Sequence, residues 1–186
     1  APDANDEYFL YQTLLGAWPL RDDEMPAFRE RIRAYLIKAV REAKVHTAWI
    51  EPDSAYEEAF VSFFDSLMER RGEGTFLESF VPFCRRVSRL GLTNALAQLL
   101  LKLTLPGVPD LYQGTELWDF SLVDPDNRRP VAFEPRRAFL DELRKRGRSG
   151  TGSLLQEILQ DPRDGRVKMY LVFKVLSFRK RYPDLF

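Results

Sequence analysis

The sequence predicts a mainly α-helical fold, an orthogonal helical bundle with one short strand, and two observations lead to this prediction. Apolar side chains recur every three to four residues over most of the chain, which is the spacing of a helix with one buried face. Residues 105–130 interrupt this spacing, because their prolines and glycines exclude a regular helix and leave room for one strand at 108–112.

The composition is that of one compact soluble domain without a global charge bias. Of the 186 residues, 45% are hydrophobic and 30% are charged, and a chain of this length can bury a core without disulfides or metal. The 28 basic and 28 acidic residues balance, so no net field favours nucleic acid or a membrane surface. No apolar run reaches the roughly 20 residues of a membrane helix, and the lone Cys84 suits a reducing, cytoplasmic location.

Three helices are expected before residue 72. An opening helix covers 7–15, and a second begins after the capping candidates Asp22-Asp23, with Pro26 in its first turn. A third follows Pro52-Asp53-Ser54 and ends at Arg71-Gly72. The apolar face of the second helix is formed by Phe28, Ile32, Tyr35, Leu36, Ala39, Val40 and Ala43. This apolar face needs another element to bury it, and the third helix has an apolar face that matches it.

A longer helical pattern runs from 75 to 103, with Pro82 and Gly91 as expected kink or break points. Its second half is apolar on three sides, which predicts a central position in the core. Cys84 falls on its apolar face and is expected to be a packed group.

Three further helices are expected, at 135–146, 153–159 and 166–181. The last is apolar around nearly its full circumference, so it should be covered on all sides or made for a surface that this chain lacks. The chain starts Ala1-Pro2-Asp3 without a methionine, and we therefore expect a piece of a longer protein.

The interrupting segment also carries the most specific motif. Its core, PGVPDLYQGTE, resembles the eighth barrel strand of the alpha-amylase family of glycoside hydrolases and transglycosylases. The matching positions are Pro106, Gly107, Pro109, Tyr112, Gly114 and Glu116. Stretches at both ends and in the middle of the chain resemble the branch of that family that forms trehalose ends on maltooligosaccharides. Ala132 is a departure, because the family has Asp after the RRPV motif, so a contact of that carboxylate is not expected here.

The resemblance implies a retaining intramolecular transglucosylation, which needs a nucleophilic carboxylate and a second carboxylate as acid and base. The family takes these groups from barrel strands four, five and seven, and the His-Asp motif that follows strand seven is absent here. We therefore assign no catalytic residue, metal or cofactor to this chain, and expect it to be inactive without the rest of the barrel. Residues 1–105 would be a helical insertion subdomain and 106–186 the last strand, a substrate-side loop and terminal helices, both in one compact unit.

The loop from Tyr112 to Arg129 follows the expected strand, where barrel enzymes bind substrate. The candidate maltooligosaccharide-binding residues are Tyr112, Glu116, Trp118, Arg128 and Arg129. Glu116 can contact sugar or anchor the loop through an ion pair, and the two hypotheses have equal weight. Trp118 can stack on a sugar ring or pack in the core.

Other polar residues fit structural roles better than chemical ones. Asp124 and Asp126 are two residues apart on a turn and should pair with Arg128 or Arg129 rather than act as acid and base. A calcium loop is excluded, because Arg129 and Pro135 occupy the positions of its glycine and glutamate. The only histidine, His46, has no metal-binding motif around it, which favours a hydrogen-bonded structural role.

Two other classes of function remain open. A local basic stretch could bind nucleic acid or an acidic partner, although a solvated helix face explains it better. It comprises Arg128, Arg129, Arg136, Arg137, Arg144, Lys145, Arg146 and Arg148. The other possibility is a structural helical interaction domain. Retention on heparin would favour the basic module, and maltooligosaccharide binding by the longer protein would favour the enzyme.

Overall fold

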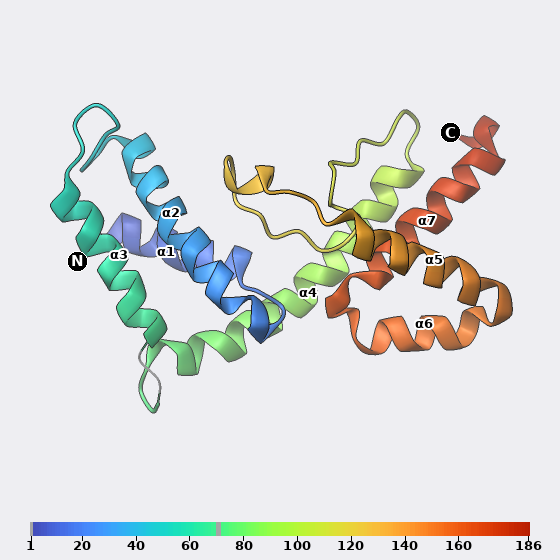
Figure 1. Ribbon diagram of the computed structural model, residues 1–186, viewed down its shortest axis with the longest axis horizontal. Helices are drawn as coiled ribbons and strands as arrows, with labels where there is room; N and C mark the ends of the chain where they lie inside the picture. Colours follow the sequence, from blue (N-terminus) through green and yellow to red (C-terminus); the bar gives the residue numbers. More distant parts are fainter. Residues whose placement is uncertain (1, 70–71) are drawn as a thin grey trace. The chain divides into compact units, whose positions relative to one another are not determined.

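The computed structural model describes residues 2–69 and 72–186, with the backbone alone at 148 and 149 (Figure 1). The α-helices are α1 (Ala4–Ala17), α2 (Met25–Ala43), α3 (Ser54–Glu69), α4 (Phe76–Thr104), α5 (Phe133–Ser149), α6 (Thr151–Gln160) and α7 (Arg166–Arg181). Short 3-10 turns lie at Asp22–Glu24, Asp126–Arg128, Pro162–Asp164 and Pro183–Leu185. Those residues contain no strand, so the mainly α prediction is confirmed and the short strand is absent from the described part.

The chain forms two compact units. Unit 1 consists of Ala1–Arg89 with Phe120–Arg128, and unit 2 consists of Leu90–Asp119 with Arg129–Phe186. The division falls within α4, whereas the sequence analysis places a boundary after residue 105. Each unit has a core of its own.

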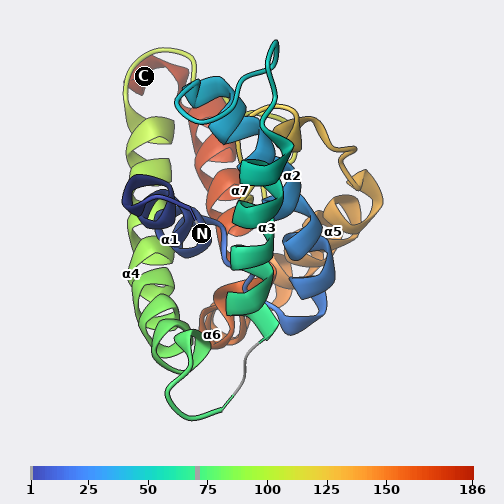
Figure 2. The same cartoon turned by 90° about the vertical axis from the view of Figure 1, so that its left-hand side faces the viewer.

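Unit 1 is built on the predicted match between the second and third helices. α2 and α3 lie side by side, and α1 contacts α2 (Figure 2). The largest fully buried side chains here are Leu10, Leu14, Phe28, Ile32, Leu36, Phe60, Phe64 and Met68. On α2 they fall at intervals of four residues, so the buried stripe is narrower than the predicted face, and Tyr35 and Ala39 are only partly covered. Each fully buried large side chain stabilises the unit by about 1.5–3 kcal/mol.

The predicted start signal is confirmed at α3 and the predicted cap is wrong at α2, while α1 has a cap that the sequence analysis did not predict. The Asp3 carboxylate accepts the Asp6 amide at 2.8 Å and caps α1, and Asp53 accepts the Tyr56 amide at 3.0 Å at the start of α3. The prediction that Asp22 or Asp23 caps α2 is wrong. Both lie in a 3-10 turn, and the Asp23 carboxylate is held by the Arg21 guanidinium at 2.6 Å instead. α3 ends at Glu69, and Arg71 of its expected end lies outside the described residues.

α4 continues through Pro82 and Gly91 without a break. Proline removes one backbone hydrogen bond, and the remaining bonds of a 29-residue helix carry it past this site. Cys84 is fully buried as expected, and burial raises the pKa of its thiol. The predicted central position of the second half holds for one face only, since Leu103 is buried while Leu101 is 60% exposed.

Unit 2 has its core where α5, α6 and α7 contact one another. The buried members are Leu143, Leu154, Ile158, Val167 and Met169, and a second cluster comprises Leu99, Leu103 and Val172. The prediction for α7 reproduces both of its ends. Its apolar circumference is not covered on all sides in the described residues, because Phe178 remains 47% exposed.

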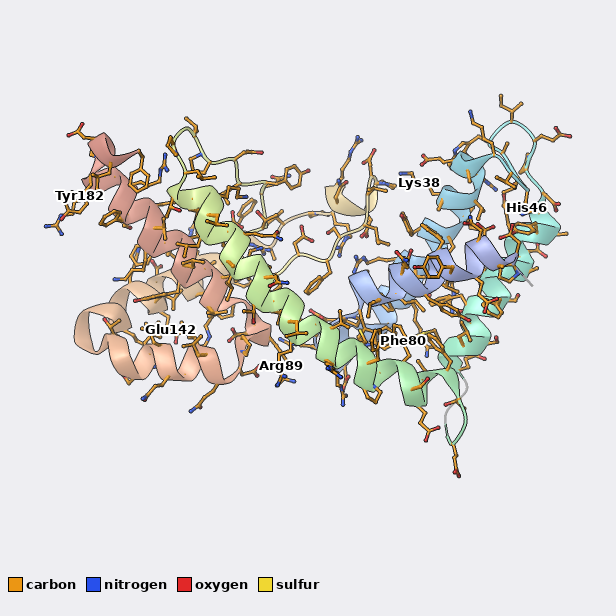
Figure 3. The ribbon with its side chains drawn as sticks, turned by 180° about the vertical axis from the view of Figure 1, so that it is seen from behind. Lys38, His46, Phe80, Arg89, Glu142 and Tyr182 are labelled. Carbon is orange, nitrogen blue, oxygen red and sulfur yellow. The ribbon has the colours of Figure 1, made fainter. Side chains whose placement is uncertain are left out.

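An ion-pair network joins the three helices of this core. Glu157 on α6 accepts from Arg146 of α5 at 2.6 Å and from Arg166 of α7 at 2.9 Å. Glu142, labelled in Figure 3, accepts from the same two guanidinium groups at 3.0 and 3.2 Å. Hydrogen bonds from Arg146 and Arg166 lower the pKa of Glu157 to about 2.

This network predicts an acid-sensitive unit 2. The folded pKa of Glu157 lies near 2 and the ordinary value is 4.5, so its contribution is present above pH 4.5 and is lost as the pH falls toward 2. We expect the thermal midpoint to fall across this window, and Glu157→Gln to flatten that fall while lowering the midpoint at pH 7. Thermal melts followed by circular dichroism from pH 7 to pH 2 measure this. An identical acid limb in Glu157→Gln would refute it.

Candidate functional site

The candidate site is the segment 105–130, which has no regular secondary structure except the 3-10 turn Asp126–Arg128. The strand expected at 108–112 is not formed. Val108 is 98% exposed. A strand needs a neighbour for its ladder of hydrogen bonds, and the described residues supply none beside this segment. Its backbone carbonyls are instead bound by side chains of the helices.

Arg179 on α7 holds the start of the segment. Its guanidinium donates to the carbonyls of Leu103 at 3.0 Å, Leu105 at 2.9 Å and Gly107. One side chain therefore binds three carbonyls at alternate positions at and just beyond the end of α4, where no further turn of helix supplies amide donors to them. The helix α4 ends at this point, and the PGVP motif follows it.

Arg136 on α5 holds the next part, which carries the Tyr-x-Gly-x-Glu motif. It donates to the Gly114 carbonyl at 2.8 Å and to the Glu116 carboxylate at 3.3 Å. Gly114 has φ +89°, and a Cβ there would lie 3.1 Å from a Val131 methyl group. Only glycine fits this position without strain. Of the two hypotheses for Glu116, the contacts in unit 2 support loop anchoring.

Trp118 is fixed by a hydrogen bond and by packing. Its indole N–H donates to the Pro162 carbonyl at 2.6 Å, and its ring packs against the core of unit 2. Lys168 donates to the neighbouring Leu117 carbonyl at 2.9 Å and lies 5.4 Å from the Trp118 ring centre. Burial of the Lys168 ammonium lowers its pKa. Gly165 has φ +80°, and a Cβ there would lie 3.1 Å from the Leu117 side chain and from the Trp118 amide nitrogen. These contacts support the packing role of Trp118 within the described residues.

The part of the segment in unit 1 is bound to α2. Arg31 forms a two-pronged ion pair with Asp126, with both N–O distances 2.8 Å, and also donates to the Phe120 carbonyl at 2.7 Å. Asp126 accepts the Leu122 amide at 2.7 Å. Lys38, about two turns further along α2 and labelled in Figure 3, donates to the Asp124 carbonyl. The ion pair is largely shielded, since the two side chains are 19% and 11% exposed.

The predicted pairing of the two aspartates is half right. Asp124 pairs with Arg128, as expected for a turn. The main partner of Asp126 is Arg31, which is 95 residues earlier and was not among the candidate residues. The available signal was the spacing of Arg31 and Lys38, which are seven residues apart and so share a face of α2.

The five candidate sugar-binding residues are divided between the units. Tyr112, Glu116, Trp118 and Arg129 belong to unit 2, and Arg128 belongs to unit 1. Tyr112 is 49% exposed, and its carbonyl accepts the Thr115 amide at 3.1 Å and the Thr115 hydroxyl at 2.6 Å in a tight turn. The Arg128 side chain is 72% exposed. Tyr112 therefore offers an accessible ring, whereas Glu116 and Trp118 are engaged by other residues.

Three arginines of α5 in the basic stretch pair with carboxylates. Arg136 pairs with Glu116, Arg144 with Asp141, and Arg146 with Glu142 and Glu157. The Arg148 side chain lies outside the described part of the chain. This pairing favours a solvated helix face over a nucleic-acid surface.

His46 has the structural role that its surroundings indicate. Its Nε2 atom lies 2.7 Å from the Asp3 carboxylate, and its ring stacks on Tyr56 with centres 4.4 Å apart. Asp3, Asp6 and His46 place potential metal-binding atoms within 4.8 Å of one another. Each of these atoms has a protein partner, since the Tyr56 hydroxyl lies 2.5 Å from Asp6.

In the described residues no helix is long and apolar enough to cross a membrane.

Comparison with known proteins identifies the chain, although no family model matches it. It is 43% identical over 143 residues to a Mycobacterium tuberculosis protein described as a maltooligosyl trehalose synthase. The match covers 77% of this chain and 18% of that protein. The structure of maltooligosyltrehalose synthase from Arthrobacter ramosus is 40% identical, with a TM-score of 0.75 over 97% of this chain and 21% of the other. A further maltooligosyl trehalose synthase structure gives a TM-score of 0.80 at 36% identity, over 97% of this chain and 23% of the other.

The chain thus spans about a fifth of the length of the relatives that it matches. Over that span the identity is well above the level at which similarity shows a fold alone, and the match includes nearly all of the described helices. Together with the motif of the 105–130 segment, these matches show that the chain belongs to the maltooligosyl trehalose synthase family, as a segment of such a protein.

Proposed function

We propose that the longer protein containing this chain is an intramolecular glucosyltransferase of the isomerase class. It converts the α-1,4 bond at the reducing end of a maltooligosaccharide into an α,α-1,1 bond. The observation that carries the proposal is the 36–43% identity to maltooligosyl trehalose synthases, which extends over most of the chain. The carboxylate partners of Arg136, Arg144 and Arg146 in the basic stretch argue against the alternative of a nucleic-acid-binding module.

This chain would supply a wall of the substrate site and no catalytic carboxylate. A retaining transfer needs two carboxyl groups about 5 Å apart on either side of the sugar bond. Two carboxylates of the 105–130 segment serve another purpose, since Asp126 and Glu116 are paired with Arg31 and Arg136. The nucleophile and the acid would come from other parts of the longer protein.

We assign the reducing-end side of the site to the loop Tyr112–Arg129. Released glucose must remain bound, turn and attack the glycosyl intermediate before water does, so the walls of the site must be fixed and exclude solvent. Tyr112, with its exposed ring, would stack on sugar. Glu116, Trp118, Arg128 and Arg129 would hold hydroxyl groups or keep the loop in place.

The 186-residue chain alone should form no trehalose from maltooligosaccharides, because it lacks the reacting carboxylates. The longer protein containing it should form trehalose-terminated products. Product analysis by chromatography with both proteins, at equal concentration, measures this. Turnover by the isolated chain would contradict the assignment of chemistry to the rest of the protein, and a longer protein without trehalose formation would contradict the proposed function.

In the longer protein, Trp118→Ala should raise the ratio of glucose released to trehalose formed. The loss of one contact with the retained glucose, worth about 1 kcal/mol, would change the ratio of glucose release to trehalose formation about fivefold. Trp118→Phe is the matched variant, because it keeps a smaller aromatic ring and removes the N–H that donates to the Pro162 carbonyl. It should change the ratio less than Trp118→Ala. If neither variant changes the ratio while both lower the thermal midpoint, Trp118 is only a core residue.

A further inference from the structure

The loop between α2 and α3, residues 44–53, is ordered by an unusual number of contacts for its position at the edge of unit 1. The Thr47 hydroxyl donates to Glu57 at 2.7 Å and accepts the Asp53 amide at 2.9 Å. The Ala48 amide donates to the Glu51 carbonyl at 3.1 Å, which closes the tip of the loop. The tip nevertheless contributes little to the core, since Trp49 is 55% exposed and Ile50 is 99% exposed.

Among the described residues, Trp49 is held by Arg41 on one side of its ring. The Arg41 guanidinium lies 5.0 Å from the centre of its ring. Arg41 is itself fixed by Glu57, with both N–O distances 2.7 Å, and Glu57 is only 5% exposed. The buried Glu57 carboxylate therefore fixes the Arg41 guanidinium, and this guanidinium orients the Trp49 ring. Its indole N–H has no hydrogen-bond partner among residues 2–69 and 72–186.

The surroundings of Trp49 favour a neutral, hydroxylated ligand. The charge of Arg41 is balanced by Glu57, and the exposed Lys44 and Glu51 on the same loop have opposite signs. A flat apolar ring, a donor N–H and hydroxyl-binding groups of both signs suit the C–H face and hydroxyls of a sugar ring. Balanced charge gives no preference for anions or cations.

We infer that Trp49 is a glucan-binding platform on unit 1, which stacks on a glucose unit of an α-1,4-linked chain. The inference rests on the proposed function for the class of sugar. It concerns a separate loop from Tyr112–Arg129. A pre-oriented ring loses little conformational entropy on binding, so a small exposed site can still contribute to affinity.

The test compares variants of the longer protein for binding to maltoheptaose by isothermal titration calorimetry and for kinetics with the same sugar. Trp49→Ala should weaken binding about two- to tenfold and raise KM, with kcat unchanged, as expected for loss of one aromatic stacking contact. Trp49→Phe should keep most of the affinity. Ile50→Ala is the matched control, because it removes a more exposed apolar side chain from the same tip, and it should leave binding unchanged.

Unchanged affinity and KM in Trp49→Ala would overturn the platform, and so would an equal loss in Ile50→Ala. A lower thermal midpoint in Trp49→Ala without lower affinity would show that Trp49 packs against protein, which also contradicts the inference. Trehalose formation by the unaltered protein tests the proposed function separately. If it fails while Trp49→Ala still weakens maltoheptaose binding, the platform stands and only the proposed reaction is wrong.

Discussion

Hydrogen bonds from arginine and lysine side chains to backbone carbonyls hold the long irregular segment 105–130. Arg179 and Arg136 bind it in unit 2, and Arg31 and Lys38 bind it in unit 1. A hydrogen bond to a charged group contributes about 1.5–3 kcal/mol net, roughly twice a neutral one. The five donors of a guanidinium allow one side chain to bind several acceptors. The helices thus substitute for the strand neighbours that such a segment would have within a sheet.

This arrangement explains which parts of the fold the sequence could predict. Helix positions follow from a local apolar period, and the ends of α7 were predicted without error for that reason. The predicted cap of α2 was wrong because Arg21 competes with the helix amides for the Asp23 carboxylate. The spacing of apolar residues contains no signal for this competition. The prediction of a strand at 108–112 was wrong for a different reason. Strand formation depends on a neighbour, and a local pattern of apolar residues cannot report whether one is present.

The sequence predicted where the candidate site lies, but only some of the contacts that hold it. The proline and glycine content located the segment, and the motif containing Gly114 and Glu116 led to its family. Its anchors come from 20 to 95 residues away, as Arg136–Glu116 and Arg31–Asp126 show. The shared face of Arg31 and Lys38 on α2 was a signal for the anchoring residues, but it does not indicate which partners they bind. The Trp49 loop was overlooked because exposure at a loop tip depends on three-dimensional packing. A transfer reaction that must retain glucose needs rigid walls, and both loops owe their order to guanidinium–carboxylate pairs.

The most direct test of this account is hydrogen–deuterium exchange of the segment in Arg31→Ala. The Leu122 amide is bound by Asp126, and the amides of Asp126 and Arg128 donate within the same turn. Loss of Arg31 should speed their exchange while α2 and α3 exchange as before. Arg137→Ala, at an exposed arginine on α5, is the control and should leave these amides unchanged. Unaltered exchange of the Leu122, Asp126 and Arg128 amides in Arg31→Ala would contradict the claim that cationic side chains order this segment.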